Sequence, residues 1–108
     1  MLFSKHSKHK YKLEAAHSFK ISDDYFAIPK GFTSDGATIP KMFWKIIGSP
    51  FSPDFIEAAF VHDYLIYISY DGKLRDQKFY EVLLKNDVGR IRARVMWYGV
   101  TIYRKLFL

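Results

Sequence analysis

The spacing of hydrophobic positions changes after residue 39. Before that point it favours extended structure, because residues 10–15 alternate polar and apolar side chains with the period of a half-exposed strand. A second strand is predicted at residues 25–28 and a short third one at residues 31–33, with a turn at residues 23–24. We therefore expect the N-terminal part of the chain to form a small antiparallel sheet or hairpin.

After this extended part, the spacing favours helices. The predicted helices cover about residues 40–47, 53–69, 74–85 and 90–106. Ser52 followed by proline is a typical helix start, because the serine can cap free backbone amides and the proline needs no amide partner.

The third and fourth of these helices each have a predicted inner face. On the third, Asp76 shares the helical spacing of the apolar residues, so a carboxylate lies on the buried side. The other residues of that face are Phe79, Tyr80 and Leu83. On the last helix the residues predicted to point inward are Ile91, Val95, Tyr98 and Ile102, with Arg90, Arg94 and Arg104 elsewhere.

These patterns predict an α+β fold. We expect one domain over residues 1–108, in which a small N-terminal antiparallel sheet or hairpin packs on three to four α-helices; residues 1–39 are mostly extended and residues 40–108 mostly helical. The composition agrees with a folded domain, since 49% of the residues are hydrophobic and 19% aromatic. The absence of cysteine excludes disulfides, thiolate zinc sites and cysteine nucleophiles.

The formal charge of +6 favours anionic partners, namely a lipid surface, an acidic wall polymer or nucleic acid. Nucleic acid is the least expected of these, because the cations gather near the two ends without a recognition motif. The same charges also suit a solvated surface. The start of the chain lacks the apolar core of a signal peptide, and no apolar run approaches the roughly 20 residues of a transmembrane helix, so we expect a soluble protein.

The candidate chemistry lies where polar side chains interrupt apolar helix faces. His62 and Asp63 stand side by side in a helix of otherwise apolar residues, and Asp76 lies on the apolar face of the next helix. A buried carboxylate needs hydrogen-bond donors or a cation. In ideal antiparallel helices, His62 and Asp76 would be offset by about 9 Å along the axis, and a shorter first helix would bring them together.

Two interpretations of this cluster follow from the residues. In the first, His62 is a general base oriented by Asp76, while Asp63 and Asp35 provide oxygen ligands for a divalent metal, calcium or zinc. In the second, the same groups form a buried polar network that holds the loop at residues 33–40 against the helices.

Three motifs of the sequence carry a family resemblance. They are Gly31-Phe32-Thr33-Ser34-Asp35-Gly36-Ala37-Thr38-Ile39-Pro40, then His62-Asp63-Tyr64-Leu65, then Asp76 followed by Phe79. Over about residues 27–84 the chain resembles a family of small uncharacterised domains of tailed phages and prophages. Its pattern is Gly-Phe-x-Thr-Asp-Gly-Ala-Ser-Ile-Pro, His-Asp-x-Leu-Tyr and an aspartate two residues before a phenylalanine. This chain departs from it at Ser34, at Ile66 in place of tyrosine, and in the spacing of Asp76 and Phe79.

The resemblance implies a phage origin, and with it the host cytoplasm or the phage particle as location. The pair His62-Asp63 with a later Asp76 is also locally similar to secreted phospholipase A2. That likeness implies His62 as the base that activates water, Asp63 as a calcium ligand and Asp76 as the residue that orients the histidine. The chain lacks the glycine-rich calcium loop and the cysteines of that enzyme family.

Two function hypotheses remain. The first is a small phage-encoded hydrolase that uses the His-Asp cluster on an envelope component, either a lipid ester or a cell-wall polymer. The second is a non-enzymatic virion or tail component, or an accessory factor, that binds a phage structural protein or a host protein.

Overall fold

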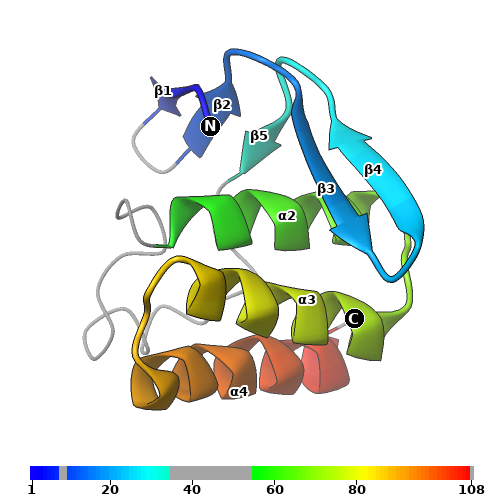
Figure 1. Cartoon of the computed structure of the whole chain (residues 1–108), viewed down its shortest axis with the longest axis vertical. Helices are drawn as coiled ribbons and strands as arrows, with labels where there is room; N and C mark the ends of the chain where they lie inside the picture. Colours follow the sequence, from blue (N-terminus) through cyan, green and yellow to red (C-terminus); the bar gives the residue numbers. More distant parts are fainter. Residues whose placement is uncertain (8–9, 35–54, 108) are drawn as a thin grey trace. The chain divides into compact units, whose positions relative to one another are not determined.

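The computed structural model describes residues 1–7, 10–34 and 55–107 (Figure 1). The contacts divide the chain into two compact units, Met1–Asp35 and Gly36–Leu108. The first unit contains strands and the second contains helices, which confirms the α+β fold class. That the two units form one domain stays a prediction.

The first unit contains two antiparallel sheets. Strands β1 (Phe3–Ser7), β2 (Lys10–Leu13) and β5 (Thr33–Ser34) form one sheet in the order β1-β2-β5. Strands β3 (His17–Ile21) and β4 (Asp24–Ile28) form a separate hairpin in which His17 pairs with Ile28. The three predicted strands are present, whereas β1 and β3 were not predicted, because serine, lysine and histidine occupy most of their positions.

The hairpin turn lies one residue earlier than predicted. It is formed by Ser22 and Asp23, and Asp24 already belongs to β4. Ser22 has a φ of 54°, the left-handed conformation that a tight hairpin turn requires. Across the strands, Phe19 stacks on Phe26 with ring centres 5.3 Å apart.

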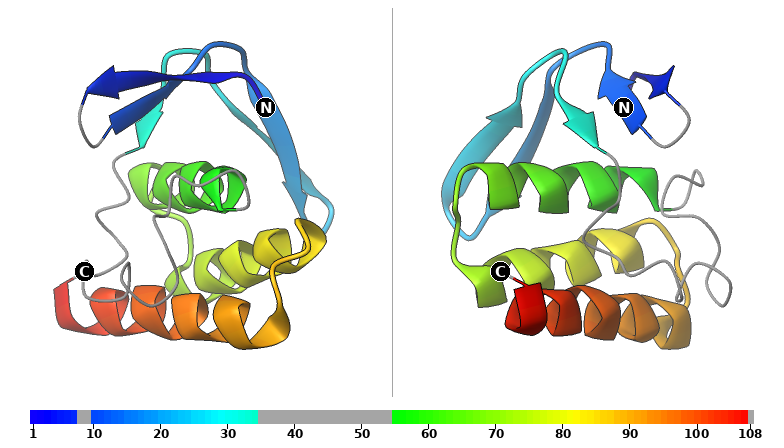
Figure 2. Two further views of the ribbon diagram at one scale, coloured as in Figure 1. Left: turned by 90° about the vertical axis from the view of Figure 1, so that its left-hand side faces the viewer. Right: turned by 180° about the vertical axis from the view of Figure 1, so that it is seen from behind.

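The described part of the second unit contains three helices, α2 (Ile56–Tyr67), α3 (Gly72–Lys85) and α4 (Arg90–Phe107). Helix α3 packs against both α2 and α4, as Figures 1 and 2 show. The three corresponding predicted helices are confirmed, although α2 begins at Ile56 instead of residue 53; the predicted cap at Ser52 lies outside the described residues. The predicted helix at residues 40–47 lies outside the described residues. None of the described helices has the length and apolar character that crossing a bilayer requires.

Helices α2 and α3 end in the same way. After α2, Ser69 has a φ of 58°, its amide donates to the carbonyl of Ile66, and the amide of Tyr70 donates to that of Leu65. After α3, Asp87 has a φ of 62°, its amide donates to the carbonyl of Leu84, and the amide of Val88 donates to that of Leu83. This pattern is the Schellman motif, which usually has glycine at the left-handed position. It ends α2 at Tyr67, two residues earlier than predicted.

The core of the helical unit joins all three helices. Its buried residues are Phe55, Ala58, Phe79, Val82, Leu83, Val88, Ala93, Met96 and Val100. The predicted inner face of α3 is therefore confirmed at Phe79 and Leu83.

The predicted inner face of α4 is wrong. Ile91, Tyr98 and Ile102 are exposed, and Val95 is half-buried. The buried face is instead formed by Ala93, Met96, Gly99, Val100 and Thr101. Helix α4 carries apolar residues on two faces, and the face with smaller side chains is the one that packs against the other helices.

Candidate functional site

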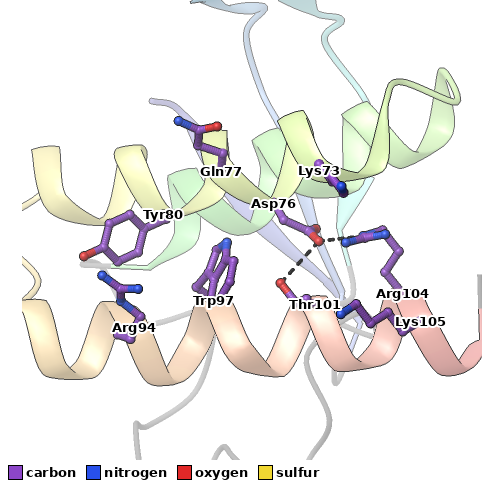
Figure 3. Close-up of a pocket in the computed structure, with 9 residues that line it drawn as sticks. All are labelled: Lys73, Asp76, Gln77, Tyr80, Arg94, Trp97, Thr101, Arg104 and Lys105. Carbon is purple, nitrogen blue, oxygen red and sulfur yellow. Dashed lines mark hydrogen bonds and ion pairs between the residues drawn. The ribbon is translucent and has the colours of Figure 1, made fainter.

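A chain of polar contacts links the three helices at Asp76. His62 of α2 lies with Nε2 2.8 Å from Oδ1 of Asp76 on α3. Arg104 of α4 donates from Nε to the other oxygen, Oδ2, at 2.8 Å, and the hydroxyl of Thr101 donates to the same oxygen at 3.4 Å. Figure 3 shows the two contacts from α4. One carboxylate therefore accepts hydrogen bonds from both neighbouring helices.

The cluster is buried. The side chains of His62 and Asp76 are each 2% exposed, and that of Arg104 is 22% exposed. An ionised carboxylate accepts hydrogen bonds and cannot donate, so Nε2 of His62 carries a proton in this pair. In the neutral imidazole the lone pair then lies on Nδ1.

Burial acts against the charged form of Asp76 and raises its pKa, while its partners act in the opposite direction. The hydrogen bonds from His62 and Arg104, and the positive charge beside the carboxylate, outweigh burial and hold the pKa of Asp76 below its ordinary value. Asp76 is therefore ionised at neutral pH.

The early end of α2 explains why His62 reaches Asp76. The Schellman motif at Ser69 shortens the helix, so that His62 and Asp76 are nearly equally far from the turn between α2 and α3. The same antiparallel pairing brings Glu57 near the start of α2 to the end of α3, where Lys85 and Asn86 donate to it at 3.1 and 3.0 Å.

Gly72 leaves room for Arg104 over the first turn of α3. A Cβ atom at this position would lie 2.5 Å from Cδ and 3.1 Å from Nε of Arg104. These are the atoms that carry the guanidinium toward Asp76. Sequence analysis missed Thr101 and Arg104, which lie 25 and 28 positions after Asp76, and Gly72, whose role depends on Arg104, because nothing local in the sequence relates α4 to the start of α3.

A cavity of about 420 Å³ lies between α3 and α4, with Asp76 in its wall (Figure 3). Its cationic side chains are Lys73, Arg94, Arg104 and Lys105. Gln77, Tyr80, Trp97 and Thr101 complete the lining. The guanidinium carbon of Arg94 lies 5.2 Å from the ring centre of Tyr80 and 5.9 Å from that of Trp97, so this cation is held between two aromatic rings.

The structure brings together two of the four predicted site residues, His62 and Asp76. Asp63, the next residue on α2, is half-buried and does not line the cavity between α3 and α4. Asp35 lies outside the described residues. Within residues 1–7, 10–34 and 55–107, no group of three His, Cys, Asp or Glu side chains is placed to hold a metal. The calcium or zinc site at Asp63 and Asp35 stays a prediction.

Removing the carboxylate of Asp76 should destabilise the helical unit strongly. Asp76→Ala leaves His62 and Arg104 without their buried acceptor, and we expect a loss of about 3–5 kcal/mol at neutral pH. The pKa of Asp76 is lower in the folded protein than in the unfolded chain. The contribution of Asp76 to the free energy of unfolding is therefore complete above about pH 4 and is lost as the pH falls through the pKa of the folded protein. Urea denaturation of both proteins should therefore show the difference shrinking in acid. Asp23→Ala in the exposed turn is the control, and a loss as large as that of Asp76→Ala would contradict the assignment.

Adding one methyl group at Gly72 should displace Arg104. Gly72→Ala gains helix propensity, yet we expect a net loss of about 1 kcal/mol or more, because the charged hydrogen bond to Asp76 is strained or broken. Gly89→Ala is the matched control, since a Cβ there has no neighbour within 4 Å. Thermal denaturation of Gly72→Ala in an Arg104→Ala background completes the test. In the Arg104→Ala background, Gly72→Ala should not lower the melting temperature. If it lowered the melting temperature as much as in the parent, the clash would not be with Arg104.

Comparison with known proteins places the chain among uncharacterised relatives. Protein y4jT of Sinorhizobium fredii is 32% identical over 95 residues, which cover 79% of this chain and 28% of y4jT. Protein y4iH of the same organism is 31% identical over 72 residues, which cover 62% of this chain and 28% of y4iH. Both are described as uncharacterized. The chain thus spans little more than a quarter of the length of these relatives. No solved structure matches it.

The comparisons support one part of the predicted resemblance. The chain falls in an uncharacterised family, as its motifs indicated, whereas the phage origin stays a prediction. A family model matches residues 11–100, which is most of the sequence. The chain therefore belongs to the family described as protein of unknown function (DUF1353).

Proposed function

We propose that the chain is a non-enzymatic binding module and that the cavity between α3 and α4 receives an anionic group. The observation that carries this proposal is the charge of the cavity wall. Four cationic side chains face one carboxylate, and that carboxylate is already paired with Arg104 and His62. An anion entering the cavity meets an excess of positive charge.

The shape and lining of the cavity narrow the class of ligand. Its volume of about 420 Å³ suits a small molecule or the head of a larger one. Arg94 between Tyr80 and Trp97 offers a charged group beside flat aromatic surfaces. The ligand that fits is a phosphate or carboxylate attached to a flat or apolar body. An anionic envelope component, or an acidic side chain of a phage structural or host protein, has this chemistry.

Isothermal titration calorimetry with phenyl phosphate as the probe tests this proposal. We expect binding that weakens with salt, and Lys73→Gln combined with Lys105→Gln should lower the affinity about tenfold or more, because both ammonium groups line the cavity. Lys20→Gln in the strand unit removes a charge far along the sequence and is the control. Equal affinity for phenol, or no effect of the double substitution, would reject the anion site.

A hydrolase is the second candidate, and the contact of 2.8 Å between His62 and Asp76 favours it. In this proposal Asp76 orients His62, which removes a proton from water through Nδ1, and Asp63 with Asp35 holds calcium or zinc. The substrate is a lipid ester or a cell-wall polymer of the envelope. The balance of observations supports the binding module more strongly, because His62 is 2% exposed and does not line the cavity between α3 and α4.

His62→Gln separates the two functions. The glutamine amide can still donate to Asp76 but cannot act as a base at neutral pH. If the chain is a hydrolase, this variant should fold and lose ester or wall-polymer hydrolysis at least about a hundredfold. If it is a binding module, the affinity for phenyl phosphate should change less than about threefold. A hydrolytic activity that His62→Gln retains would exclude His62 as the base.

A further inference from the structure

One face of α4 carries a row of apolar residues, and most of them are exposed. We call it the α4 stripe, and its members are Ile91, Val95, Tyr98, Ile102 and Leu106. Successive members are three or four residues apart, so they lie on one side of the helix. Ile91 is 83% exposed, Tyr98 52%, Ile102 43% and Leu106 69%. Val95 is half-buried against the core, and the other four members are exposed.

The charge of α4 is of one sign. Between Arg90 and Phe107 the helix has no acidic residue, and its basic residues are Arg90, Arg92, Arg94, Arg104 and Lys105. At about 100° per residue, Arg94 and Lys105 fall along one edge of the α4 stripe and Arg92 along the other. Cations therefore border the apolar row on both sides. By contrast, α2 and α3 each contain acidic residues.

We propose that the α4 stripe lies on the surface of an anionic lipid bilayer. An apolar face bordered by arginine and lysine is the composition of helices that lie in the plane of a membrane interface, where the apolar side chains enter the boundary of the acyl chains and the cations meet lipid phosphates. Tyr98 in the stripe suits this boundary, because aromatic side chains with a polar atom concentrate there.

The positive charge of α4 distinguishes between three possible partners of the α4 stripe: a second copy of the chain, an acidic helix and a bilayer. A second copy of the chain would bring arginines against arginines, with no carboxylate from either α4 to compensate. Ile91, Val95 and Tyr98 of the stripe share a shallow groove with Tyr80, Leu84, Arg90 and Arg94, and an acidic helix in this groove would meet the cations of one edge only. A flat anionic surface meets Arg92 on one edge and Arg94 with Lys105 on the other. The bilayer therefore satisfies more of the charge of α4.

This inference does not depend on the cavity between α3 and α4. Arg94 and Lys105 line the cavity and also border the α4 stripe, whereas none of the five apolar residues of the stripe lines the cavity. If the cavity did not bind phosphate, the argument for the α4 stripe would be unaffected. The two proposals can therefore be rejected independently.

Sedimentation with vesicles tests the proposal on the whole chain. We expect binding to vesicles of phosphatidylglycerol mixed with phosphatidylcholine and at least about tenfold weaker binding to pure phosphatidylcholine. Ile91→Ser combined with Ile102→Ser should weaken binding to the anionic vesicles at least about tenfold, because these side chains would enter the interface. Both residues are exposed, so the variant should keep the melting temperature of the parent. Arg92→Gln should cost about fivefold.

Two controls make the outcome specific. Tyr25→Ser removes a 78% exposed aromatic residue from the strand unit and should leave vesicle binding unchanged. Lys20→Gln removes a positive charge from the strand unit and should change it less than about threefold. Equal binding to both kinds of vesicle, full binding by the isoleucine variant, or no binding by the parent would overturn the proposal. Stronger binding of soluble polyglutamate, reduced by the same isoleucine variant, would overturn it in favour of an acidic protein partner.

Discussion

The helical unit depends on satisfying one buried carboxylate. Asp76 lies on the inner face of α3, where an ionised group without partners would cost several kcal/mol. His62 approaches from α2, and Arg104 and Thr101 approach from α4. Because the donors come from both neighbouring helices, a sliding of either helix along α3 would leave the carboxylate or a donor unpaired. The cluster thus selects one register for packing surfaces that are otherwise apolar and tolerant of shifts.

The same cluster shapes the charge of the cavity next to it. Arg104 uses Nε for Asp76, and Gly72 leaves space for the aliphatic part of its side chain over α3. The guanidinium is therefore fixed at the cavity wall instead of moving freely in solvent, which lowers the entropic cost of meeting an anion. Lys73 and Lys105 add charge at the same wall. An interaction that stabilises the fold in this way also prepares a cationic surface.

The sequence predicted the partners His62 and Asp76 because each interrupts an apolar helix face, and polar groups on such faces have to satisfy one another. Whether they touch depended on where α2 ends. That end is set by Ser69 in a left-handed conformation usually taken by glycine, so the local sequence carried little signal for it. Arg104 was not predicted because its hydrogen bond to Asp76 forms only when α4 packs on α3. The inner face of α4 was misassigned because its larger apolar residues, Ile91 and Ile102, were given more weight than Ala93 and Gly99.

The inner face of α4 was predicted wrongly because this helix has apolar residues on two faces. A helix with apolar residues on two faces cannot bury both against a single neighbour, and here α3 covers the face of Ala93, Met96 and Val100. The second face keeps exposed isoleucine, tyrosine and leucine side chains and is bordered by arginine and lysine. Folding alone does not require large apolar residues at those positions, since polar ones would leave the core intact. Their presence in a helix of uniform positive charge fits the proposed partner, which is apolar at its centre and anionic at its edge.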